Sequence, residues 1–169
     1  EVGGFPFHIA EILNNYGIRA YYISLAEQEA GYDSTVFHYG EQHKEWDLSQ
    51  KLKNCSTQEE VIAKLQQIGG SYEITCCLAT GRKSFLLNKA GIQYYYWSSG
   101  ADLNEDCFTP SWPNDYPLRT MVKRWLYYHL YIRPEARRSL GKSKGLMIAP
   151  YQYNAYQRLC PKKQLFFLP

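Results

Sequence analysis

The sequence lacks the patterns that mark several common classes of protein. No apolar run approaches the roughly 20 residues that a transmembrane helix needs, and no secretory signal peptide opens the chain. The cysteines are odd in number and match no zinc spacing, so we interpret them as reduced thiols of a cytoplasmic protein. They are Cys55, Cys76, Cys77, Cys107 and Cys160. We therefore expect no structural metal, no disulfide framework and no membrane span.

The motifs of the best-known catalytic sites are also missing. There is no Gly-x-Ser-x-Gly elbow, no Walker loop, no His-Glu-x-x-His motif and no cysteine with a histidine close by in sequence. His38, His43 and His129 are interpreted as structural or exposed. No internal repeat or low-complexity segment is present. The sequence therefore leaves the catalytic residues unassigned and predicts no cofactor.

Aromatic residues, by contrast, are abundant. The 169 residues include 16 Tyr, 7 Phe and 4 Trp, and the polar tips of Tyr and Trp suit half-buried surfaces, domain interfaces and sugar-stacking sites. A general bias of the source organism towards Tyr is the alternative explanation. The length suits a single domain, 1–169, which buries about 70% of its unfolded surface without help from a metal or disulfide.

Positive charge is concentrated in one segment, although the net charge is only +3. A helix there that is both basic and aromatic has two interpretations. In the first, its aromatic side packs on a sheet and its basic side is solvated; we favour this interpretation because Trp125 and Tyr128 lie at core-like spacing. In the second, the segment 118–144 makes peripheral contact with the inner face of a membrane. Nucleic acid is not expected as a partner at a pI of about 8.5. Eight basic residues and one acid, Glu135, lie between Pro117 and Gly145: Arg119, Lys123, Arg124, Arg133, Arg137, Arg138, Lys142 and Lys144.

Helical and extended patterns alternate along the chain. Helices are predicted at 5–17, from 56 to 68 with a capping box of Ser56 and Glu59, at 84–88 and at 151–159. A further helix is predicted at 118–132, where Pro134 kinks or stops it, and a second helical piece follows to about Leu140. Strands are predicted at 18–25, 35–39, 73–78, 92–97, 146–149 and 164–168. This alternation predicts an α/β fold with a Rossmann-like, doubly wound, mainly parallel sheet. The predicted core includes Val61, Leu65, Cys76, Cys77, Tyr95 and Ile148.

Three polar segments adjoin the predicted elements. Gly3 and Gly4 precede a helix that carries His8, where backbone N–H groups and the helix dipole favour a diphosphate, although a plain tight turn is the simpler interpretation. Thr80, Arg82 and Lys83 follow one strand. Either Arg82 or Lys83 contacts a phosphate or an acidic acceptor, or the segment is a solvated basic turn, which is the simpler interpretation. Ser99 and Asp102 follow another strand, where Asp102 accepts hydrogen bonds from a sugar or caps a turn.

In order, these residues resemble one family. The chain is similar to the N-terminal half of the large retaining GT-B glycosyltransferase family, which includes bacterial mannosyl- and glucosyltransferases. The resemblance spans nearly the whole chain. The residues that carry it are Gly3-Gly4, His8-Ile9-Ala10-Glu11-Ile12-Leu13, Tyr16-Gly17-Ile18-Arg19-Ala20, Ser99-Gly100-Ala101-Asp102-Leu103, Gly145-Leu146-Met147-Ile148-Ala149 and Leu168-Pro169.

The resemblance implies a function and its partners. The enzyme would move a hexose from a nucleotide-sugar donor to a carbohydrate or lipid-linked acceptor, with retention and without a metal. The first strand and the C-terminal donor-binding domain are expected to lie outside this chain, so that domain is itself a partner. Together with the strand-end positions, the resemblance gives an expected substrate-binding set: Gly3, Gly4, His8, Thr80, Arg82, Ser99 and Asp102.

Two departures from the family limit what it implies. The loop Trp97-Ser98-Ser99 has no His where many members have one, so no catalytic His is assigned. The donor-binding Glu-x7-Glu motif belongs to the second domain, which leaves the donor unidentified. Two other functions stay open: a non-catalytic α/β module that binds anionic partners through its basic helix, and a GT-B epimerase or phosphorylase.

Overall fold

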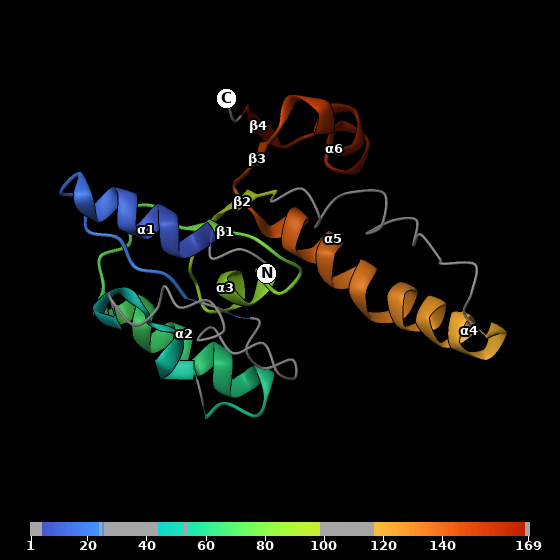
Figure 1. Cartoon of the computed structure of the whole chain (residues 1–169), viewed down its shortest axis with the longest axis horizontal. Helices are drawn as coiled ribbons and strands as arrows, with labels where there is room; N and C mark the ends of the chain where they lie inside the picture. The colour runs from blue at the N-terminus through green and yellow to red at the C-terminus, as the bar shows by residue number, and fades with distance from the viewer. Residues whose placement is uncertain (1–4, 24, 26–43, 53, 99–116, 168–169) are drawn as a thin grey trace. The chain divides into compact units, whose positions relative to one another are not determined.

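The computed structural model describes residues 5–23, 25, 44–52, 54–98 and 117–167 (Figure 1). The chain divides into two compact units, Glu1–Lys64 and Leu65–Pro169, and the boundary falls within helix α2 (Gln58–Ser71). The predicted strand at 35–39 lies outside the described residues.

The first unit contains α1 (Phe5–Asn15) and two short 3-10 helices, η3 (Lys44–Trp46) and η4 (Ser49–Leu52). Gly17, with a φ of 76°, ends α1 as predicted. The side-chain amide of Asn14 then donates to the carbonyls of Ala10 and Ala20, which fixes the chain that leaves the helix. The strand predicted at 18–25 is wrong over the described residues: only Tyr22 pairs, in an isolated parallel bridge to Asp47, because no longer partner segment lies alongside it there.

The N-terminal cap of α2 lies one residue later than predicted. The backbone N–H of Glu60 donates to Thr57 Oγ1 at 3.2 Å, while the Glu60 carboxylate accepts the N–H groups of Ser56 at 2.6 Å and Thr57 at 3.2 Å. The capping box is therefore Thr57 with Glu60 rather than Ser56 with Glu59. The two overlapping pairs have the same spacing, so the sequence pattern alone does not choose between them. These backbone donors lower the pKa of Glu60.

The second unit holds a four-stranded sheet in which all strands are parallel, in the order β1-β2-β3-β4. The parallel α/β prediction is confirmed. Strands β1 and β2 begin later than predicted, since residues 73–77 and 92–94 lie outside the ladders. Their bounds are β1 Leu78–Ala79, β2 Tyr95–Trp97, β3 Gly145–Ile148 and β4 Gln164–Phe167.

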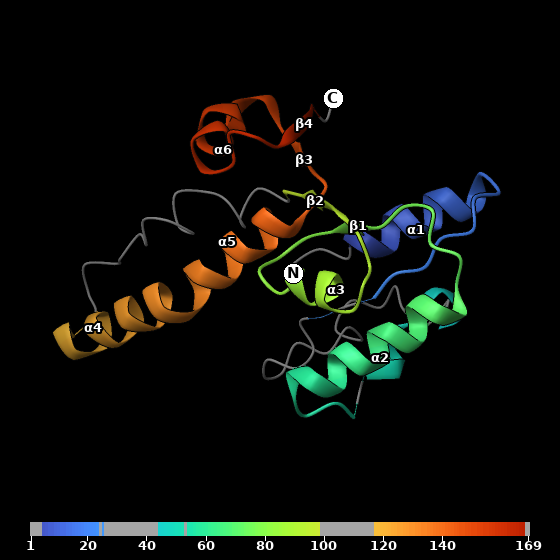
Figure 2. The same ribbon diagram turned by 180° about the vertical axis from the view of Figure 1, so that it is seen from behind.

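Helices connect these strands and cover one face of the sheet (Figures 1 and 2). Helix α3 (Phe85–Lys89) follows β1, a long helical segment follows β2, and α6 (Tyr153–Leu159), preceded by the 3-10 turn η7 (Pro150–Gln152), follows β3. The long segment comprises α4 (Leu118–Tyr127), a π-helical turn η6 (Tyr128–Ile132) and α5 (Arg133–Lys142). Helices α3 and α5 pack against each other.

Burial in the sheet follows the two-residue period of its strands. Tyr94 and Tyr96 are buried, as are Leu146 and Ile148 on the neighbouring strand, and the Tyr94 hydroxyl donates to the Ser139 carbonyl of α5 at 2.6 Å. These side chains therefore form the face that the helices cover. Burial raises the pKa of Tyr94.

The core prediction is confirmed for Val61, Leu65 and Ile148, which are buried, and is wrong for the other three residues. Cys76 is exposed and Cys77 half-buried, because both precede the short edge strand β1 instead of lying within it. Tyr95 is half-buried because it points to the face opposite Tyr94 and Tyr96, where its ring meets Phe166 edge-on at 5.6 Å.

The predicted second helical piece beyond Pro134 is confirmed by α5, so the helix continues past Pro134 and does not stop there. A proline ring clashes with the carbonyl four residues earlier, and the wider π turn of η6 lies directly before it. We attribute the π turn to this clash, because its i to i+5 pattern relieves the crowding of an α-helical turn. The favoured packing of the aromatic side is also wrong for α4, whose Trp125 is 50% exposed.

Candidate functional site

Polar residues gather where the parallel strands of the second unit end. The loop Thr80–Ser84 follows β1, Ser98 follows β2, and the turn from Ala149 to Gln152 follows β3. Because the carboxyl ends of parallel strands meet at the same edge of a sheet, these three segments share one edge. We call this set, Thr80–Ser84, Ser98 and Ala149–Gln152, the carboxyl-edge cluster.

The first segment of the cluster is held tightly by Ser84. Its Oγ lies 2.8 Å from the carbonyl oxygens of both Thr80 and Gly81, and its side chain is fully buried. Gly81 has a φ of 85°, a left-handed conformation that glycine adopts readily and other residues rarely adopt. The loop is thus a fixed turn between β1 and α3, and its shape is set before any ligand arrives.

Arg82 is directed towards α5. Its Nε lies 3.6 Å from Glu135 Oε2, with both side chains about one-fifth exposed, and its carbonyl accepts the Ser139 hydroxyl. Glu135 therefore offsets part of the positive charge of Arg82, the residue that we expected to contact a phosphate. Thr80, two residues earlier, lies at the strand end and its carbonyl accepts from Ser84. The substrate-binding roles of Thr80 and Arg82 stay predictions.

The second and third segments are joined by a buried side-chain hydrogen bond. Gln152 Nε2 donates to Ser98 Oγ at 3.0 Å, and Gln152 Oε1 accepts the N–H of Ala149 at 3.0 Å. Both side chains are nearly inaccessible, at 5% and 6% exposure. The Ser98 N–H also donates to the Met147 carbonyl at 3.0 Å. Ser98, which directly precedes the predicted site residue Ser99, is therefore held by both its side chain and its backbone.

Sequence reasoning missed Gln152. The only local signal was its position. Gln152 lies three residues after Ala149, with Pro150 between them, and this is the spacing of a capping interaction at the start of a helix. Its partner Ser98 lies 54 residues away in sequence. Only the topology of the sheet, which places the ends of β2 and β3 next to each other, brings the two side chains together.

The remaining predicted site residues are not all placed. Gly3, Gly4, Ser99 and Asp102 lie outside the described residues. His8 lies in α1 of the first unit, with Nδ1 3.4 Å from Glu11 Oε2. The structure thus places Thr80 and Arg82 in one loop, and the expected meeting of Gly4 with Asp102 stays a prediction.

A separate pocket of about 470 Å³ opens at the other edge of the sheet, before the strands begin. Cys76, Cys77, Gly91, Gln93 and Lys144 are among its lining residues. Burial, with the neighbouring Cys76 thiol as a smaller cause, raises the pKa of Cys77 to about 11. Cys77 is therefore protonated at neutral pH and a weak nucleophile, because the thiolate is the reactive form.

Neither a metal cluster nor a membrane-crossing helix is found in the described part of the chain. No protein-family model, curated protein or solved structure matches this sequence.

Proposed function

We propose that this chain is the acceptor-side domain of a GT-B glycosyltransferase, which transfers a hexose from a nucleotide-sugar to a carbohydrate or lipid-linked acceptor. One observation carries the proposal: Gln152 anchors Ser98, directly before Ser99 and Asp102, on the same sheet edge as Thr80. Ligands of open parallel α/β sheets bind beyond that edge.

We infer that the parallel sheet is one half of a Rossmann-like, doubly wound architecture. Its four described strands follow chain order without the reversal that marks a switch point. They would form one half of such a sheet. The face opposite the helices carries Tyr95, Trp97, Met147 and Phe166, all half-buried. In a doubly wound fold, helices of the other half would cover these side chains.

The proposed chemistry assigns roles by position. Gly3 and Gly4 would donate backbone N–H groups to the leaving diphosphate, a preorganised electrostatic role. Asp102 would accept a hydrogen bond from an acceptor hydroxyl, and Thr80 would lie alongside the acceptor at the end of β1. Arg82 is kept as a weaker contact because Glu135 already pairs with it. The cytoplasm, where nucleotide-sugars are found, is the proposed location.

Two substitutions in the full-length protein separate these roles. We expect Asp102→Ala to lower kcat/KM for the acceptor by about 10- to 100-fold, the effect of one hydrogen bond to a charged group, with donor binding little changed. Gly4→Val is expected to weaken donor binding instead, because a side chain blocks the approach of the backbone to the diphosphate. Release of nucleoside diphosphate, measured against donor and acceptor concentration, distinguishes the two.

Asp106→Ala is the matched control, since it removes the same group four residues further along. It should leave both constants unchanged. If Asp102→Ala and Gly4→Val both turn over normally, this chain does not contribute to the active site.

A further inference from the structure

The most exposed apolar surface of the described second unit lies on α4. Leu118, Val122, Trp125 and Leu126 recur at helical spacing on one stripe, and each is at least 43% exposed. Leu130 of η6 is also exposed, at 63%, as is Tyr131 at 57%, whose ring pairs with that of Tyr127 on the side of α4 away from the stripe. A stripe of this kind is ordinarily covered by a partner or a membrane.

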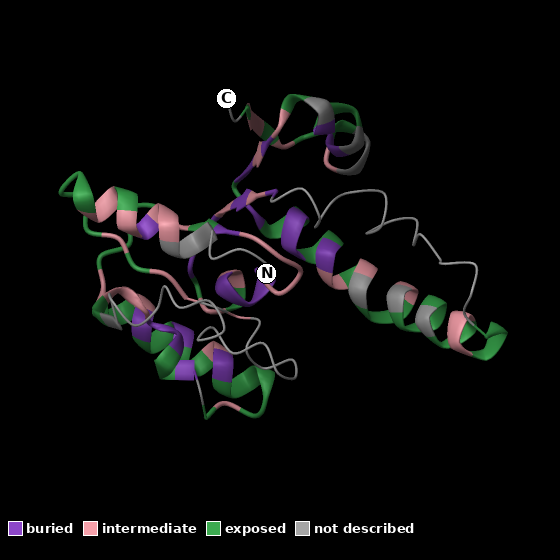
Figure 3. Cartoon of the chain, viewed as in Figure 1, coloured by how far each residue is buried: buried purple, intermediate pink, exposed green. Residues whose placement is uncertain are grey.

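The π turn takes this stripe out of line with the buried face of α5. Eighteen residues separate Val122 from Leu140, which is five turns of an unbroken α-helix, so the two would lie in line. Leu140 is buried with Ala136 and Ser139. The extra residue in the π turn rotates α4 by about 100° relative to α5. Figure 3 accordingly shows the buried residues of the long helix at its α5 end and exposed residues along α4.

The charge around the stripe is of one sign. No Asp or Glu occurs from 117 to 134. Arg119 and Lys123 are exposed and flank the stripe one residue after Leu118 and Val122. Such long side chains carry their charge to the polar layer while their stems lie along apolar surface. An identical copy placed on this stripe would bring like charges together, which disfavours a symmetric dimer.

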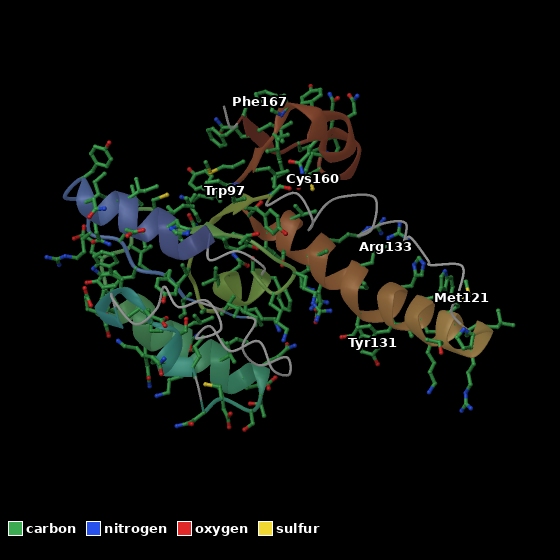
Figure 4. All side chains as sticks on the ribbon, viewed as in Figure 1. Trp97, Met121, Tyr131, Arg133, Cys160 and Phe167 are labelled. Atoms are coloured by element: carbon green, nitrogen blue, oxygen red, sulfur yellow. The ribbon has the colours of Figure 1, made fainter. Side chains whose placement is uncertain are left out.

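The aromatic rings of the segment are arranged as pairs along the helix. Trp125 lies 4.4 Å from the His129 ring, and Tyr127 lies 5.5 Å from Tyr131. In Figure 4, Tyr131 and Arg133 leave opposite sides of the helix. Rings with an apolar body and a polar tip prefer the boundary between lipid headgroups and acyl chains.

We propose that α4 and η6 form a docking surface for an anionic lipid bilayer. The helix lies in the plane of the headgroups, the stripe Leu118, Val122, Trp125 and Leu126 enters the acyl boundary, and Arg119 and Lys123 contact lipid phosphates. This surface is argued from the helix alone and does not depend on glycosyl transfer.

Vesicle co-sedimentation of the full chain at low salt tests the proposal. We expect binding to vesicles of phosphatidylcholine with phosphatidylglycerol and none to phosphatidylcholine alone, and the binding should fall as salt screens the charges. Arg119→Glu with Lys123→Glu should weaken binding about 30-fold or more, from about 1 kcal/mol per basic residue. Val122→Asp with Trp125→Asp should also abolish it, because both side chains enter the bilayer.

The matched control is Arg137→Glu with Lys142→Glu, which makes the same charge change on exposed positions of α5. It should weaken binding much less than the α4 pair. Equal loss in both pairs would show a general charge effect and overturn the proposal, as would no binding at low salt. Sedimentation velocity tests the remaining alternative. If the chain self-associates, the double variant Val122→Asp with Trp125→Asp removes that association, and no vesicle binding is seen, then a second copy of the chain occupies the stripe and the proposal is overturned.

Discussion

Replacing Ser139 with alanine is expected to lower the free energy of unfolding by roughly 3 kcal/mol. Ser139 is fully buried in α5, and its hydroxyl serves two backbone groups at the start of α3. It accepts the Phe85 N–H at 3.0 Å and donates to the Arg82 carbonyl. Alanine leaves the buried Phe85 N–H and the part-buried Arg82 carbonyl without this partner, and each such loss costs about 1–3 kcal/mol.

Ser139 in effect caps a helix from 54 residues away. The first N–H groups of a helix have no partner within it, and Ser84, at the usual capping position, turns its hydroxyl back to Thr80 and Gly81 instead. The change therefore loosens the carboxyl-edge loop as well as the helix packing.

Ser71→Ala is the control for Ser139→Ala. The Ser71 hydroxyl also donates to a backbone carbonyl, that of Gln67 at 2.7 Å, but at an exposed position where water replaces it. Urea denaturation should show a large decrease in the free energy of unfolding for Ser139→Ala and almost no change in it for Ser71→Ala. Similar values for the two would contradict the packing of α3 on α5 described above.

Two glycine-to-alanine changes are expected to move stability in opposite directions. A Cβ at Gly145 would lie 2.9 Å from Phe166 Cε2, 3.1 Å from the Gln164 carbonyl oxygen and 3.3 Å from Tyr95 Cδ1. The carbonyl belongs to the strand beside β3, so it cannot move without disturbing the β3–β4 ladder. Overpacking of this kind costs roughly 1–3 kcal/mol.

Gly141→Ala should instead stabilise the protein by about 0.5–1 kcal/mol. Gly141 lies within α5, and a Cβ there meets nothing within 4 Å. The denaturation midpoint should therefore fall for Gly145→Ala and rise for Gly141→Ala. A loss of stability in both, or a gain in both, would contradict the close approach of Tyr95 and Phe166 over Gly145.

Local patterns in the sequence predicted much of the secondary structure. Periodicity placed β3, β4 and α3 within a residue of their observed bounds, and Gly17 ended α1 because its conformation suits a helix end. Alternation of helices and strands predicted the parallel sheet. These features depend on residues close together in the chain, which a sequence displays directly.

Features that depend on distant residues were not predicted. Three consecutive tyrosines hide which of them faces the core, because the period of a strand fixes alternation but not its phase. The contacts of Ser139 with Arg82 and of Gln152 with Ser98 need the sheet topology to bring them together. The π turn before Pro134 was not predicted either, because helical periodicity does not distinguish a π turn from an α-helical one.

The candidate site was predicted in part. Strand-end reasoning identified the Thr80–Ser84 segment and the loop that begins after Ser98, and the structure places their described residues on one edge. It did not foresee that Glu135 pairs with Arg82, because Glu135 lies in a distant helix. Nor did it foresee the pocket beside Cys77 at the opposite edge.

Hydrogen–deuterium exchange of the full-length protein, with and without a nucleotide-sugar and a glycan acceptor, tests the central claim most directly. A ligand at the carboxyl-edge cluster should slow exchange at 80–84, 98–103 and 149–152, where backbone groups become shielded. Exchange at 74–77 and 90–93, beside the pocket at the opposite edge, should not change. Protection confined to those pocket segments, or no protection anywhere in the chain at saturating ligand, would contradict a sugar-binding site at the carboxyl ends of the strands.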